Sequence, residues 1–99
     1  MNEVILLGRL TDDVKLTQTG TSQYSRFDLA VNGNQEGTVD FIRCVAFKTT
    51  AQTLAAHCVK GQQLLVEGSI RVSKHEGKTY YSVVCRRIKF LQKPQPKEA

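Results

Sequence analysis

The chain has 99 residues, of which 40% are hydrophobic and 23% charged, and this size and composition predict one soluble globular domain with one core. No apolar run approaches the roughly 18 residues of a membrane-spanning helix, and a first strand that starts near Met1 leaves no room for a signal peptide. The cysteines Cys44, Cys58 and Cys85 are odd in number and widely spaced. This argues against a disulfide framework, so we expect buried thiols and a cytoplasmic location.

The basic residues are concentrated in the later part of the chain. Residues 1–40 carry three basic and six acidic residues, a net charge of −3, whereas residues 41–99 carry eleven basic and three acidic residues, a net charge of +8. The whole chain therefore has a formal net charge of +5. A basic domain favours an anionic partner, either a nucleic acid or an anionic membrane surface.

Hydrophobic periodicity predicts three strands in the first half of the chain. The run from Val4 to Leu10 is apolar, and its interior glycine indicates a bulge or bend. Residues 17–22 are typical of a turn, and the segment from Tyr24 to Val31 alternates between apolar and polar side chains. A polar loop over residues 32–37 leads to a strand over residues 40–48, so we expect these last two strands to form a hairpin.

The strand over residues 40–48 is the most informative segment. Its alternation places Ile42, Cys44 and Ala46 on one purely apolar face, which is typical of core. The opposite face carries two aromatic rings and a guanidinium, from Phe41, Phe47 and Arg43. Rings interleaved with a cation suit single-stranded nucleic acid, because bases stack on rings and phosphates pair with cations. The alternative is that an oligomer covers this second face and makes it core as well.

A change of period predicts a helix over residues 49–59. We expect Thr49 or Thr50 to cap its start, and Lys60 followed by Gly61 to close it. The residues with helical spacing are Ala51, Leu54, Ala55 and Cys58.

Two further strands follow, over residues 63–73 and 80–91, with a turn at 74–78 and a disordered polar tail over 93–99. Five strands with a helix between the third and fourth are the plan of the OB-fold, an all-β barrel, which we expect over residues 1–92. A small α+β sandwich is the alternative.

Several side chains outside the 40–48 strand are candidate nucleic-acid contacts. Tyr80 and Tyr81 are adjacent and point to opposite faces, so we expect one in the core and the other exposed or at a subunit interface. Tyr80 and His75 join Phe41 and Phe47 as candidate stacking residues. Each basic residue alone could be a solvated surface charge, and Lys60 could simply favour the helix dipole. The candidate phosphate contacts are Arg43, Lys48, Lys60, Arg71, Lys74, Lys78, Arg86 and Arg87.

An enzymatic interpretation finds little support in the sequence. No Cys-x-x-Cys, no His-x-x-x-His and no glycine-rich phosphate loop before a helix is present. We therefore expect a binding protein that uses no metal, no cofactor and no membrane.

The ordered motifs resemble those of bacterial single-stranded DNA-binding proteins of the SSB family. The resemblance extends over residues 1–91. It implies a homotetramer of OB-folds that coats single-stranded DNA in replication, recombination or repair, with stacking at Phe41 and Phe47 and basic contacts at Arg43, Lys48, Lys60 and Lys74. The motifs are Met1 to Thr11, Thr19-Gly20, Phe27 to Asn32, Asp40 to Phe47, Lys60-Gly61, Val66 to Ile70 and Ile88 to Leu91.

The sequence departs from the pattern of that family in three respects. The loop over residues 32–37 is short and lacks an aromatic, there is no tryptophan, and the chain ends in Lys97-Glu98-Ala99 rather than in an acidic tip. We expect that tip either to have been removed or not to be the means of recruiting partners. Two rival interpretations stay open: a dimeric primosome component resembling primosomal replication protein N, and an OB-fold interaction module that binds no nucleic acid.

Overall fold

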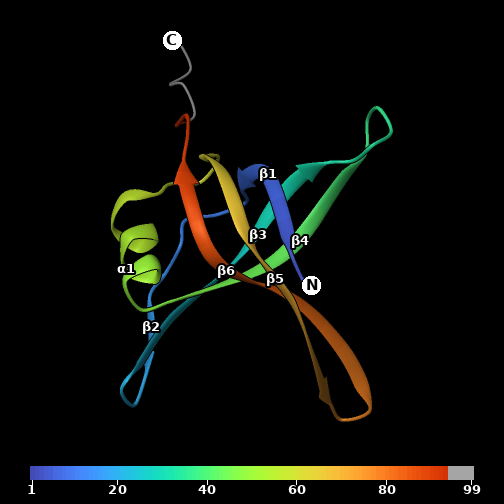
Figure 1. Cartoon of the computed structure of the whole chain (residues 1–99). Helices are drawn as coiled ribbons and strands as arrows, with labels where there is room; N and C mark the ends of the chain where they lie inside the picture. The colour runs from blue at the N-terminus through green and yellow to red at the C-terminus, as the bar shows by residue number, and fades with distance from the viewer. Residues whose placement is uncertain (94–99) are drawn as a thin grey trace.

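Five strands form a closed ring in the computed structural model, which describes residues 1–93 (Figure 1). Around the ring the strand order is β1-β5-β6-β4-β3, and β3 pairs back with β1 at Arg9↔Ala30 and Leu10↔Leu29. All neighbouring strands are antiparallel except β4 and β6, which are parallel. This confirms the OB-fold plan. The elements are β1 (Val4–Leu10), β2 (Thr17–Thr19), β3 (Ser22–Asn32), β4 (Val39–Phe47), α1 (Lys48–His57), β5 (Gln63–His75) and β6 (Lys78–Phe90).

The short strand β2 lies outside the ring and corrects one prediction. Residues 17–22 were expected to form a turn, but β2 pairs with β3 at Thr17↔Tyr24 and Thr19↔Ser22. The turn itself is confined to residues between these strands, where Gly20 has a φ of +61°. Threonine has a high strand propensity, and the adjacent edge of β3 offers it a partner.

The core of the barrel comes from the apolar faces that the alternation predicted. Cys44 and Ala46 of β4 are fully buried, and Ile42 packs against the same cluster. All three cysteines are buried and unpaired, as expected. The buried apolar residues are Leu10, Val14, Phe27, Leu29, Cys44, Ala46, Ala51, Leu54, Cys58, Leu64, Val66, Val83 and Cys85.

Two glycines allow the strands to close into a barrel. Gly8 pairs with Leu64 of β5 and precedes Arg9, where β1 pairs with β3 as well, and a Cβ at Gly8 would clash with the carbonyl oxygen of Ala30. Gly68 lies at a register shift between β5 and β6, and a Cβ there would clash with the carbonyl oxygen of Val84. Both positions need close approach of two backbones, which explains the interior glycines seen in the sequence.

The helix α1 packs against β3 and β4 through Ala51 and Leu54. Its boundaries differ from those expected. The N-cap is Phe47, which makes no side-chain capping bond, rather than Thr49 or Thr50, and the helix ends at His57. Lys60 lies beyond the last turn, where its backbone N–H donates to the Asp13 carboxylate over 2.7 Å. Lys60 therefore does not close the helix, because the chain leaves the helical conformation at Cys58.

Strands β5 and β6 continue past the barrel as a two-stranded arm, which projects at the lower right of Figure 1. Its turn is shorter than expected: Glu76 and Gly77 alone separate the strands, both with positive φ. Tyr80 and Tyr81 are 50% and 67% exposed. The expectation that one of them is core was wrong, because neither ring packs into the barrel core and both line an open cleft. The predicted disordered tail lies almost entirely outside the described residues.

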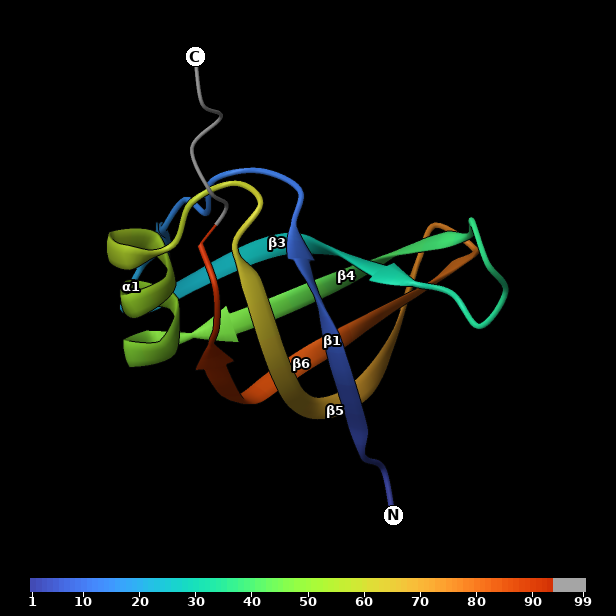
Figure 2. The ribbon, with the colours of Figure 1, turned by 90° about the horizontal axis from the view of Figure 1, so that it is seen from above.

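In residues 1–93, no helix is long and apolar enough to cross a membrane. The helix lies at one end of the barrel, and the loop between β3 and β4 lies at the other (Figure 2). Strands β3 and β4 run between these two ends.

Candidate nucleic-acid interface

The outer face of β4 carries the aromatic and basic side chains that its alternation predicted. Phe41 and Phe47 are 69% and 46% exposed, and Arg43 between them is also exposed. The two phenylalanines are six positions apart, which corresponds to about 20 Å along an extended strand. This distance is long enough for several nucleotides to lie along β4 between the two rings.

A second row of side chains on β3 extends this face. The register pairs Tyr24 with Phe47, Arg26 with Val45, and Asp28 with Arg43. The ring centroids of Tyr24 and Phe47 are 6.4 Å apart, and the Arg26 guanidinium carbon lies 5.3 Å from the Tyr24 centroid. Arg26 thus makes a cation–π contact beside the aromatic pair.

Sequence reasoning missed Arg26 and left Tyr24 unassigned. The signal was present in the alternation of the segment from Tyr24 to Val31, which places Tyr24, Arg26 and Asp28 on one face. Only the register of the β3–β4 hairpin shows that this face continues the one carrying Phe41 and Phe47.

The arm supplies a third side to the site. A cleft of about 780 Å³ lies between the β3–β4 face and the arm. It brings together three of the predicted residues, Arg43, His75 and Tyr80, from segments far apart in the sequence. We use the name aromatic–basic cleft for this site, which is lined by Arg26, Arg43, Val45, Ser73, His75, Tyr80, Tyr81 and Ser82.

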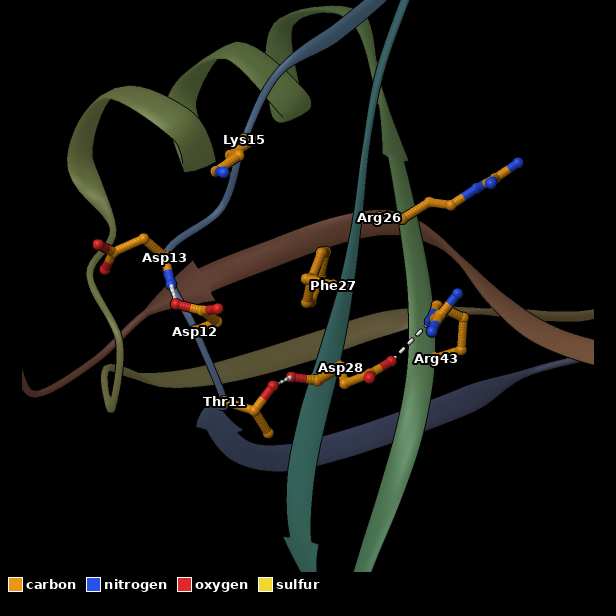
Figure 3. A pocket seen from close by; sticks show the side chains of 8 residues that line it. All are labelled: Thr11, Asp12, Asp13, Lys15, Arg26, Phe27, Asp28 and Arg43. Atoms are coloured by element: carbon orange, nitrogen blue, oxygen red, sulfur yellow. Dashed lines mark hydrogen bonds and ion pairs between the residues drawn. The ribbon is translucent and has the colours of Figure 1, made fainter.

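Arg43 does not lie free in the aromatic–basic cleft, because it forms an ion pair with Asp28 (Figure 3). Its Nε donates a hydrogen bond to the Asp28 Oδ1 over 2.6 Å. This hydrogen bond, reinforced by the charge of the carboxylate, raises the pKa of the Arg43 guanidinium. A smaller cavity of about 420 Å³ is also lined by Arg43, together with Asp12, Asp13 and Lys15.

The remaining predicted cations fall into separate groups. Arg71, Lys74 and Lys78 lie on the exposed arm, and Lys48 is the first residue of α1 beside Phe47. Lys60 and Arg86 do not line the aromatic–basic cleft.

Arg86 forms an ion pair with Glu3 next to β1. The register shift opposite Glu67 and Gly68 breaks the alternation of β6, which leaves both Arg86 and Arg87 exposed.

Comparisons with known proteins agree on one family. The model of the single-strand binding protein family matches residues 1–91. A single-stranded DNA-binding protein of Clostridium perfringens is 45% identical over 80 residues, which cover 77% of this chain and 53% of that protein. One from onion yellows phytoplasma is 32% identical over 100 residues, covering 92% of this chain and 94% of that protein.

A solved structure supports the same fold. A deletion mutant of the single-stranded DNA-binding protein from Thermus aquaticus is 29% identical, with a TM-score of 0.80. The match covers 100% of this chain and 45% of the Thermus aquaticus chain. This chain thus spans about half the length of the Clostridium perfringens and Thermus aquaticus proteins.

Proposed function

This chain belongs to the single-strand binding protein family, and from that premise we propose that it binds single-stranded DNA without a fixed recognition sequence and protects it during replication, recombination or repair. The observation that carries the proposal is the exposure of Phe41 and Phe47 on one strand face with Arg43 between them. Exposed aromatic rings cost free energy in water, and a base stacked on each ring removes that cost.

We infer that the single-stranded DNA runs along β4, with its bases on the aromatic rings and its phosphates near the cations of the arm. Tyr80 and His75 extend the stacking surface, and Arg71, Lys74 and Lys78 supply positive charge on the arm. Lys48, Lys60 and Arg86 would hold a strand that continues beyond the aromatic–basic cleft. In this arrangement the protein acts by binding and catalyses no reaction. The buried, unpaired thiols support a reducing, cytoplasmic setting.

We infer further that the protein works as a homotetramer, with a dimer as the alternative. Residues 4–8 of β1 pair with β5 on one side and with no described strand on the other. The exposed Ile5 and Leu7 lie along the same strand, at 65% and 50% exposure. An open strand edge with apolar side chains is suited to pairing with a second copy. The measured mass in solution separates a tetramer from a dimer, and Leu7→Asp should lower that mass.

The binding proposal is tested by fluorescence anisotropy with labelled oligo(dT), duplex DNA and RNA at two salt concentrations. We expect tight binding to the single-stranded DNA alone, which weakens by about 0.7 log units per log unit of salt for each phosphate contact. Absence of binding to all three probes would favour an interaction module. If the affinity for single-stranded DNA does not change with salt concentration, the basic residues do not contact phosphates.

A further inference from the structure

An acidic side chain lies in the middle of the surface that we propose for DNA. Asp28 carries the only negative charge among the side chains that β3 and β4 present on this face. Figure 3 shows Asp28 and Arg43 pointing toward one another from neighbouring strands, while Arg26 extends away from them. The residues that the paired segments of β3 and β4 place on this face are Tyr24, Arg26, Asp28, Ala30, Asn32, Val39, Phe41, Arg43, Val45 and Phe47.

The Asp28–Arg43 pair has hydrogen-bond donors and acceptors that remain available to a ligand. The two side chains are 39% and 53% exposed, and their hydrogen bond joins Nε of Arg43 to Oδ1 of Asp28. A guanidinium has five N–H donors and a carboxylate has about four acceptor positions. One bond between them therefore leaves a donor group and an acceptor group side by side on the exposed face.

Such a pair is poorly suited to a phosphate. The Asp28 carboxylate largely neutralises Arg43 at 2.6 Å, and it repels any phosphate placed beside it. The edge of a base, in contrast, presents donors and acceptors without a net charge. Phe41 and Phe47 lie on β4 on either side of Arg43. DNA whose bases stack on these two rings would therefore bring base edges past the Asp28–Arg43 pair.

We propose that Asp28 and Arg43 contact a base edge rather than a phosphate, and that they favour cytosine over uracil or thymine at this position. The cytosine amino group donates to the Asp28 carboxylate, and the cytosine ring nitrogen and O2 accept from Arg43. Uracil and thymine carry a carbonyl where cytosine carries the amino group, so two acceptors would face each other. This inference rests on the proposed function, and it adds a base preference at one point of an otherwise unspecific surface.

The test compares fluorescein-labelled deoxycytidine and deoxyuridine homopolymers of equal length by anisotropy, because these bases differ at the 4-position and in the N3 proton. The wild type should bind the deoxycytidine oligomer more tightly. In Asp28→Asn and Asp28→Ala, the ratio of the two affinities should fall by about fivefold or more. Asp40→Asn is the matched control, since it removes an equal charge from the opposite side of β4 and should leave the ratio unchanged.

The outcomes separate this inference from the function on which it rests. If both Asp28 variants raise the two affinities by one common factor, Asp28 acts through its charge alone and the inference is wrong. Equal affinity of the wild type for both oligomers also overturns the inference. This comparison needs no variant, so it holds even if thermal unfolding shows that an Asp28 variant is not folded. If the wild type binds neither oligomer, the proposed function itself is wrong.

Discussion

Phe41→Ala should weaken binding to single-stranded DNA while leaving the fold nearly intact. The ring is 69% exposed, so folding shields only about a third of it. Full burial of a phenylalanine side chain stabilises by about 1.5–3 kcal/mol, and a third of this is about 0.5–1 kcal/mol. A domain of this size loses about 4–8 °C in Tm per kcal/mol, so Tm should fall by about 2–8 °C.

The effect of the same substitution on binding should be larger. Loss of one stacked base costs about 1–3 kcal/mol, which corresponds to an oligo(dT) affinity lower by about 5- to 140-fold. Anisotropy titration gives the affinity, and thermal unfolding of the same sample gives Tm.

Phe27→Ala is the matched control for a ring in the core. Phe27 is 7% exposed, and its truncation should cost about 3–5 kcal/mol of stability. If Phe41→Ala instead lowers Tm as much as Phe27→Ala does and leaves oligo(dT) affinity unchanged, Phe41 is a structural residue and the binding face has been assigned to the wrong side of β4.

Further predictions address the neighbouring ring, the arm, the strand crossing and the core. Tyr24→Ala should weaken oligo(dT) binding, and its effect should not add to that of Phe47→Ala because the two rings are neighbours; a double-mutant cycle measures this. Lys78→Ala should reduce the slope of log affinity against log salt by about 0.7, and an unchanged slope would exclude Lys78 as a phosphate contact. Gly68→Ala should destabilise by about 1–3 kcal/mol in urea unfolding, because its methyl group would overlap the Val84 carbonyl. A hydrogen bond with Cys85, together with burial, raises the pKa of the Cys44 thiol far above its usual range. The folded Cys44–Cys85 pair thus keeps a proton that the unfolded chain releases above about pH 8.5, so stability should fall by up to about 1.4 kcal/mol per pH unit beyond that point, and less steeply when both Cys44 and Cys85 are replaced by alanine.

Local patterns predicted the five strands of the barrel, the helix and the outer face of β4, but not β2 or the ends of α1. Alternation along residues 40–48 assigned Phe41 to the surface and Cys44 to the core, because a strand exposes successive side chains to opposite sides. The same rule was wrong for Tyr80 and Tyr81. It predicts opposite faces but not which faces are covered, and in the arm neither one is.

Contacts between distant segments required the tertiary structure. Alternation places Tyr24, Arg26 and Asp28 on one face, but only the hairpin register pairs them with Phe47, Val45 and Arg43. The closed ring and the bend at Gly68 bring the arm across the same surface and form the aromatic–basic cleft. The sequence by itself determined a basic barrel with aromatic rings on one strand, because periodicity and charge are local properties. Only the tertiary structure decided that Arg43 has Asp28 as its partner, because strand pairing joins residues 15 positions apart.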